Sequence, residues 1–145
     1  MKGIAMDQQT AKSLIAAALA AREFAYAPYS NFRVGAALLA ADGRVFGGCN
    51  IENAAYGPSN CAERTAFFKA VSEGAREFAA IAVVGAANEY TYPCGVCRQV
   101  MMEFCDLKTF VILVAKTAED WRECLLEELL PHGFGPEDLG GKIHG

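Results

Sequence analysis

The chain has 145 residues, of which 53% are hydrophobic and 21% are charged. This composition is typical of a globular protein and excludes a disordered chain. The length predicts one domain over residues 1–145. The 13 Lys and Arg residues against 17 Asp and Glu residues give a net charge of −4. Nucleic-acid-binding proteins usually carry a positively charged surface, which an acidic chain does not favour, so we expect no nucleic-acid partner.

The N-terminal region carries no predicted targeting segment. Lys2 is the only basic residue among the first seven, and no apolar stretch of the signal-peptide kind follows it. No segment approaches the ~20 consecutive apolar residues of a membrane-spanning helix. We therefore expect a soluble, cytoplasmic protein with no membrane partner. In that compartment the six cysteines are expected to be metal ligands, nucleophiles or core thiols, and not disulfides.

The sequence predicts a helix, a hairpin of two strands, and then helices and strands in alternation. Apolar residues at a 3.6-residue period predict a helix over 9–25. The dipeptide Asp42-Gly43 predicts a hairpin turn between strands at 32–41 and 44–50. The order then continues helix, strand, helix, strand, helix, at 61–72, 78–85, 94–105, 109–115 and 121–130. This order predicts an α/β sandwich around a mixed sheet.

Two groups of cysteines stand where predicted helices begin. Cys61-Ala62-Glu63 opens one helix, and the segment Pro93-Cys94-Gly95-Val96-Cys97 opens the next. The free N–H groups and the dipole at a helix start favour a thiolate over a thiol. Three thiolates, from Cys61, Cys94 and Cys97, would leave the fourth position of a tetrahedral Zn²⁺ ion open for water. That arrangement is typical of catalytic zinc.

Glu63 is the candidate general acid and base of this site. Binding to zinc lowers the pKa of water to roughly 7. A carboxylate that is not itself a ligand could take the proton of that water and deliver it elsewhere. Three thiolates on Zn²⁺ leave a net negative charge, which Arg64 or Arg98 could offset by donating N–H bonds to the sulfurs.

These motifs also have simpler interpretations. A CxxC motif alone is more often a structural zinc site or a redox element, so a non-catalytic zinc module stays open. A four-cysteine structural site would need its fourth ligand from Cys49, Cys105 or Cys124. These three cysteines are isolated among apolar neighbours, and we expect them to be core thiols.

The two motifs together resemble the zinc-dependent nucleoside and nucleobase deaminases. A cysteine as the first ligand is similar to the small cytidine deaminases that hold zinc with three cysteines. Further segments that resemble the same family run over about residues 14–139, at 27–37, 48–56, 61–66, 93–99 and 128–131. The resemblance implies a three-layer α/β/α sandwich around a mixed five-stranded sheet, which is one strand more than the sequence pattern shows.

The same resemblance implies an activity, which is hydrolytic deamination of cytidine and 2′-deoxycytidine to uridine and 2′-deoxyuridine in pyrimidine salvage. A zinc hydroxide would attack C4, Glu63 would carry the proton, and ammonia would leave, with one Zn²⁺ per subunit. A blasticidin S-type aminonucleoside deaminase is the alternative within the same chemistry. The pair Asn50 and Glu52 argues against this alternative. Side chains that hydrogen-bond ribose hydroxyls would have no role with a substrate that lacks those hydroxyls.

Further residue roles follow from the resemblance alone. Asn50 and Glu52 would hold the ribose hydroxyls, and Phe32 would pack on the pyrimidine ring. Judged by spacing only, Phe32 would be a core residue of its strand, and Asn50 and Glu52 would cap the adjacent loop. The resemblance therefore makes these three residues candidates for substrate binding.

The resemblance assigns the remaining candidate residues to the base, the metal and the neighbouring subunit. The backbone around Ala62 and Cys94 would contact the base, and Arg64 would hydrogen-bond the zinc thiolates. Tyr56 and Phe134 would reach the pocket of a neighbouring subunit in a homotetramer. Judged by sequence position alone, Phe134 could simply cover a hydrophobic patch.

Overall fold

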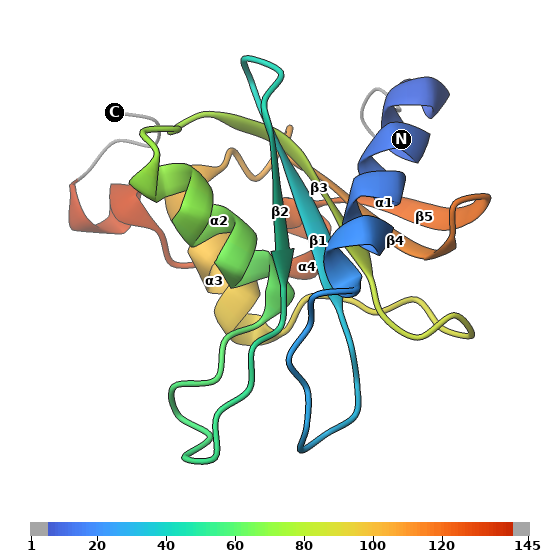
Figure 1. The fold of residues 1–145 in the computed structure, drawn as a ribbon. Coiled ribbons are helices and arrows are strands. Elements are labelled where there is room, and N and C mark those ends of the chain that lie inside the picture. The colour runs from blue at the N-terminus through green and yellow to red at the C-terminus, as the bar shows by residue number, and fades with distance from the viewer. Residues whose placement is uncertain (1–5, 141–145) are drawn as a thin grey trace.

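The computed structural model describes residues 6–140. Its five strands form one sheet in the order β2-β1-β3-β4-β5 (Figure 1). The elements in chain order are α1 (Gln8–Arg22), β1 (Gly35–Ala40), β2 (Val45–Cys49), α2 (Ala62–Ser72), β3 (Phe78–Val84), α3 (Gly95–Phe104), β4 (Val111–Thr117), β5 (Asp120–Leu125), α4 (Leu126–Leu129) and a 3₁₀-helix (Pro136–Leu139). Across residues 6–140, no helix combines the length and the apolar character needed to cross a membrane.

The predicted hairpin joins β1 and β2. Gly43 has a φ of 96°, which is costly for residues with a Cβ, and its N–H donates to the Ala40 carbonyl at 3.0 Å. β1 pairs antiparallel with both β2 and β3, β3 pairs parallel with β4, and β4 pairs antiparallel with β5. The expected mixed five-stranded sheet is therefore confirmed.

The prediction of a helix over 121–130 is wrong. Residues Asp120–Leu125 form β5, and only Leu126–Leu129 is helical. The Leu and Glu residues of this segment favour a helix by propensity. Without β5, however, the buried strand β4 would carry a row of unpaired N–H and C=O groups along one edge. Pairing with β4 outweighs the propensity and supplies the fifth strand of the sheet.

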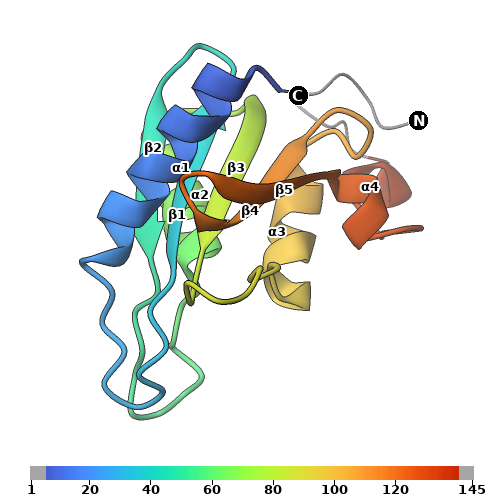
Figure 2. The same ribbon diagram turned by 90° about the vertical axis from the view of Figure 1, so that its right-hand side faces the viewer.

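Two layers of helices cover the two faces of the sheet. Leu38 and Ile81 face α2 and α3, whereas their neighbours Ala37 and Ala82 face α1. This alternation is the period-two geometry of a strand that is buried on both faces. Figure 1 shows α1 on one side of the sheet with α2 and α3 on the other, and Figure 2 shows α4 beside α3. The fold is the expected three-layer α/β/α sandwich.

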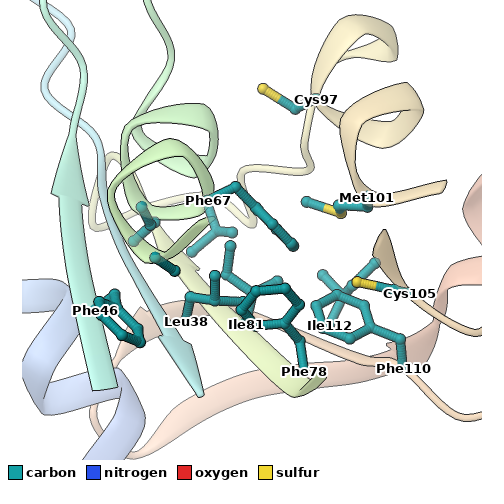
Figure 3. Packing of buried hydrophobic residues seen from close by; sticks show 14 of the residues in the cluster. Leu38, Phe46, Phe67, Phe78, Ile81, Cys97, Met101, Cys105, Phe110 and Ile112 are labelled. Atoms are coloured by element: carbon teal, nitrogen blue, oxygen red, sulfur yellow. The ribbon is translucent and has the colours of Figure 1, made fainter. Parts of the chain in front are cut away.

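The larger core cluster lies between the sheet and helices α2 and α3. The Phe67 ring of α2 is 5.2 Å from the Phe78 ring and 6.1 Å from the Phe110 ring, measured between centroids. Figure 3 shows Cys97 on the first turn of α3, apart from these rings and one turn before Met101. Both side chains are fully buried, so they lie on the core-facing side of the helix. The packing of α3 on this core therefore fixes the position of Cys97.

The register of the sheet gathers three loops at one end. Gly35 of β1 pairs with Cys49 of β2 and with Val84 of β3. Segments 23–34, 50–61 and 85–94 therefore leave the sheet at the same end, which is the lower end in Figure 1. Helices α2 and α3 begin where the second and third of these segments finish. Three loops and two helix starts meet here.

Gly48 sets how closely α2 approaches the sheet. A Cβ atom at this position would lie 2.4 Å from the carbonyl oxygen of Ala62 and 2.6 Å from the backbone nitrogen of Ala66. Because both contacts are backbone atoms, the helix would have to shift. We expect Gly48→Ala to lower the free energy of unfolding by about 1–3 kcal/mol in urea denaturation.

The neighbouring glycine offers a matched control. A Cβ at Gly47 would meet the Cβ of Ala21 at 3.4 Å and the carbonyl oxygen of Ala36 at 4.0 Å, both of which are ordinary contact distances. Gly47→Ala should therefore unfold close to the wild-type midpoint. Equal midpoints for the two variants would contradict the assignment of Gly48 as the contact that α2 requires.

Candidate active site

The three motif cysteines converge at the starts of α2 and α3. Cys61 is the N-cap of α2, Cys94 is the N-cap of α3, and Cys97 lies on the first turn of α3. Their sulfurs all lie within 4.8 Å of one another, and Cys61 Sγ is 3.8 Å from Cys94 Sγ. Two sulfurs bound at about 2.3 Å to a tetrahedral zinc lie ~3.8 Å apart, so this spacing fits one zinc ion. The cluster suggests zinc as the metal.

The other cysteines do not join the cluster. Among residues 6–140, Cys61, Cys94 and Cys97 form the one group of three or more potential metal ligands with this spacing. Cys105 is fully buried, and Cys49 and Cys124 are half-buried. A site with four cysteine ligands is therefore not formed. Three ligands on a tetrahedral zinc ion leave one position for water, which is the pattern typical of catalytic zinc sites.

Arg64, and not Arg98, lies against the sulfurs. The Arg64 guanidinium donates to Cys61 Sγ at 3.3 Å. Arg98 instead donates to the carbonyl oxygens of Pro93 at 2.7 Å and of Leu129 at 2.8 Å, and so holds the start of α3 in place. Hydrogen bonds from Cys97 and Arg64 lower the pKa of Cys61 to about 5. The same interaction with Cys61, together with burial, raises the pKa of Cys97.

Glu63 is the second residue of α2 and the one buried charged side chain in residues 6–140. It is 5% exposed, and it borders the same cavity as Cys61. Burial raises the pKa of Glu63 to about 7, and the negative charge of Cys61 adds to the increase. A carboxyl group with a pKa near neutrality can both accept and donate a proton under physiological conditions.

A cavity of about 270 Å³ opens beside Glu63 and the cysteines. Its walls come from the three loops at this end of the sheet and from the starts of α2 and α3. The lining residues are Ser30, Phe32, Val34, Asn50, Glu52, Cys61, Ala62, Glu63, Thr91, Tyr92 and Cys94. A cleft with an apolar wall, a few polar groups and a buried acid is the usual form of a small-molecule site.

Asn50 and Glu52 both border the cavity, and both also hold the loop that precedes β1. The Asn50 amide accepts from the Val34 N–H at 2.9 Å and donates to the Phe32 carbonyl at 2.8 Å. The Glu52 carboxylate accepts from the Ser30 hydroxyl and from the Ser30 N–H at 3.1 Å. The bond from the Ser30 hydroxyl lowers the pKa of Glu52, so this carboxylate stays ionised.

Phe32, Tyr56 and Phe134 occupy different places. Phe32 is partly exposed and lines the cavity, so it is not a core residue of β1. Tyr56 and Phe134 are 75% and 59% exposed and lie outside the cavity lining. Tyr56 also adopts a φ of 63°, a conformation that is uncommon for a bulky side chain.

Four cavity residues were not singled out from the sequence: Ser30, Val34, Thr91 and Tyr92. Ser30 and Val34 lie in segment 27–37, which resembles the deaminases, and so a signal for them existed. Thr91 and Tyr92 precede Pro93 in a loop without any regular pattern. Their position just before the CxxC motif was the only available indication.

Comparison with known proteins identifies the class of this site. The family model described as the cytidine and deoxycytidylate deaminase zinc-binding region matches residues 8–114. A cytidine deaminase of Sporosarcina psychrophila is 53% identical over 128 residues, which cover 88% of this chain and 93% of that protein. A cytidine deaminase of Halalkalibacterium halodurans is 54% identical over 134 residues, covering 92% and 98%.

Comparison of the fold with solved structures points to the same family. The crystal structure of a cytidine deaminase from Burkholderia pseudomallei matches with a TM-score of 0.80 and 56% identity, over 84% of this chain and 97% of that one. The fold and the three-cysteine site thus define a zinc-dependent hydrolase of the deaminase class. The chain belongs to the cytidine and deoxycytidylate deaminase family.

Proposed function

We propose that this protein hydrolyses cytidine and 2′-deoxycytidine to uridine and 2′-deoxyuridine, with release of ammonia. One observation carries the proposal: the buried Glu63 carboxyl borders a cavity next to three clustered thiols. The names of the relatives from Sporosarcina and Halalkalibacterium support the choice of substrate. The reaction adds one water at C4 of the pyrimidine and removes the amino group as ammonia, as salvage of pyrimidine nucleosides requires.

Cys61, Cys94 and Cys97 are the residues that would hold one zinc ion per subunit. The donor set fits, because three thiolates select zinc over harder cations and the sulfurs have the spacing of one tetrahedral ion. When bound, zinc supplies a Lewis acid that makes water acidic enough to ionise near neutral pH. Arg64 stabilises the negative charge of the cluster through its bond to Cys61.

Glu63 would carry the proton through the reaction. Its carboxylate would take one proton from the attacking water and deliver it to N3 of the ring. It would then take the second proton from the new hydroxyl group on C4 and deliver it to the amino group, which leaves as ammonia while C4 becomes a carbonyl. Its burial supports this role, because a carboxyl group with a pKa near 7 exchanges protons readily in both directions.

The remaining cavity residues would bind the nucleoside. Phe32 would stack on the pyrimidine, and the backbone around Ala62 and Cys94 would contact the polar edge of the base, since all three residues line the cavity. Asn50 and Glu52 would hold the ribose hydroxyls, since each lines the cavity and each has hydrogen-bonding capacity beyond its bonds to the loop. The loop bonds orient both side chains before substrate arrives.

We further propose that residues 1–145 act as a single catalytic domain in a homotetramer. Tyr56 and Phe134 support the assembly, because both are large, exposed and outside the cavity of their own chain. The unusual backbone of Tyr56 would present its ring to the pocket of a neighbouring subunit. Light scattering measures the mass, and a monomer with full activity would overturn this assembly.

The test is a deamination assay on purified protein, with zinc content measured on the same sample. We expect absorbance loss and equimolar ammonia from cytidine and 2′-deoxycytidine, and one zinc per chain. Turnover of blasticidin S without turnover of cytidine would instead assign an aminonucleoside deaminase. Stoichiometric zinc without turnover of any of these substrates would assign a non-catalytic zinc module.

A further inference from the structure

The loop between β3 and α3, residues 85–93, forms one wall of the cavity. It contributes Thr91 and Tyr92 to the lining and leads into Cys94. Apart from the bond that Glu89 donates to the Ala86 carbonyl, its backbone makes few regular hydrogen bonds. Contacts from outside the loop must therefore fix its shape.

One attachment is at Gly85, directly after β3. The Arg22 guanidinium of α1 donates to the Gly85 carbonyl at 2.6 Å. A Cβ atom at Gly85 would lie 2.2 Å from Thr91 Oγ1 and 3.0 Å from Phe32 Cζ, so Thr91 and Phe32 both pack directly on this glycine. This attachment fixes the two cavity walls relative to each other at the end of β3.

The second attachment is at Tyr90, and it comes from the β4–β5 hairpin. The Tyr90 hydroxyl donates to Asp120 Oδ1 at 2.6 Å. The Arg122 guanidinium carbon lies 4.4 Å from the centroid of the Tyr90 ring, and Lys116 Nζ lies 4.5 Å from it. Cations at these distances are attracted to the negative face of an aromatic ring.

The sheet register explains why these three charged groups meet one ring. Asp120 pairs with Thr117, and Arg122 pairs with Val114, so both stand on the strand next to Lys116. The Arg122 guanidinium lies over the ring of Tyr90, which precedes the cavity-lining residues Thr91 and Tyr92. Arg122 therefore links β5 to the loop that carries this cavity wall.

We propose that Tyr90 is a positioning residue, and that Lys116, Asp120 and Arg122 hold it so that the cavity wall at Thr91 and Tyr92 keeps its shape. This inference rests on the proposed function, because it takes the cavity as the substrate site. Lys116, Asp120 and Arg122 belong neither to the cavity lining nor to the thiol cluster. Loosening it should therefore weaken nucleoside binding without changing the chemical step.

Two conservative variants test the attachment. Tyr90→Phe keeps the ring and loses the bond to Asp120, whereas Arg122→Gln keeps a polar side chain and loses the cation over the ring. For each we expect KM for cytidine to rise about three- to tenfold, with kcat within about twofold of wild type. Amide hydrogen exchange over residues 86–92 should become faster in both variants.

Arg44→Gln is the matched control. Arg44 also lies over an aromatic ring, with its guanidinium carbon 5.3 Å from the centroid of Phe46, but it stands at the β1–β2 turn, away from the cavity. It should match wild type in KM and in exchange over residues 86–92. In the combination of Arg122→Gln with Tyr92→Ala, we expect KM to rise by less than the product of the two single effects, since Arg122 acts through the wall.

The outcomes separate this inference from the proposed function. A wild-type protein that does not deaminate cytidine overturns the proposed function, while the exchange measurement still decides on the attachment of the loop. Unchanged exchange and unchanged KM in Tyr90→Phe and Arg122→Gln overturn the inference. It is also overturned if both variants lose zinc and kcat together, because the cluster would then be a general stability element.

Discussion

Glu63→Gln is expected to lower kcat for cytidine by about 10²–10⁴-fold, which is the usual range for the loss of a general acid and base. The amide has nearly the shape of the carboxyl group, so the cavity keeps its form, but it cannot accept the proton of the attacking water. Zinc content should equal that of wild type, because Glu63 is not one of the clustered metal ligands. Steady-state kinetics and elemental analysis on the same preparation measure both quantities.

The thermal midpoint provides a further check on this variant. A buried carboxylate costs free energy unless it is paired, whereas a neutral amide costs less. Glu63→Gln should therefore unfold at or above the wild-type temperature, so lost activity would not reflect lost structure. Glu73→Gln, at the exposed end of the same helix, is the control and should keep full activity. Near-normal turnover in Glu63→Gln would assign the proton transfer to another group.

The chemistry-bearing residues of this chain could be predicted from sequence because they depend on local structure. Cys61 and Cys94 are N-caps, and Cys97 follows within the same helical turn as Cys94. A spacing of two or three residues at a helix start fixes the relative directions of the side chains, whatever the rest of the fold. The convergence of the two helix starts depends on more than local structure, because the register of β1 with β2 and β3 brings the loops before them to one end of the sheet.

Features that depend on pairing between distant segments could not be predicted in this way. The helix propensity of its residues predicts a helix for the segment that forms β5. The segment is a strand because it pairs with β4, whose backbone groups would otherwise lack hydrogen-bond partners along that edge. The choice between Arg64 and Arg98 likewise follows from where α3 meets the Leu129 carbonyl. Sequence spacing holds no information about either contact.

Dual use of side chains is the other feature that sequence did not reveal. Asn50 and Glu52 line the cavity, and they also bind the backbone that carries Ser30, Phe32 and Val34. The alternative prediction, that these two side chains cap the loop at 51–60, is wrong, because their bonds go to the segment that precedes β1. Their bonds orient that segment and the polar groups of the cavity together.

Cys94→Ser should weaken zinc binding strongly without unfolding α3. Cys94 is the N-cap of this helix and its side chain makes no capping hydrogen bond. Serine is among the preferred N-cap residues, so the helix start should be retained or strengthened. A serine hydroxyl does not ionise near neutral pH and binds zinc poorly. Structural zinc sites with four ligands bind with ~10–16 kcal/mol, so the loss of one ligand should weaken affinity by at least about a hundredfold.

Zinc affinity, measured by competition with a chromogenic chelator, distinguishes the loss of a ligand from the loss of a thiol in general. Cys49→Ser is the control, because Cys49 is half-buried in β2, outside both the cavity and the thiol cluster, and this variant should bind zinc like wild type. Cys94→Ser should lose deaminase activity in proportion to its lost zinc, and an excess of zinc should restore part of it. If Cys94→Ser binds zinc as tightly as Cys49→Ser does, then two thiols and another group hold the metal, and the three-cysteine site is wrong.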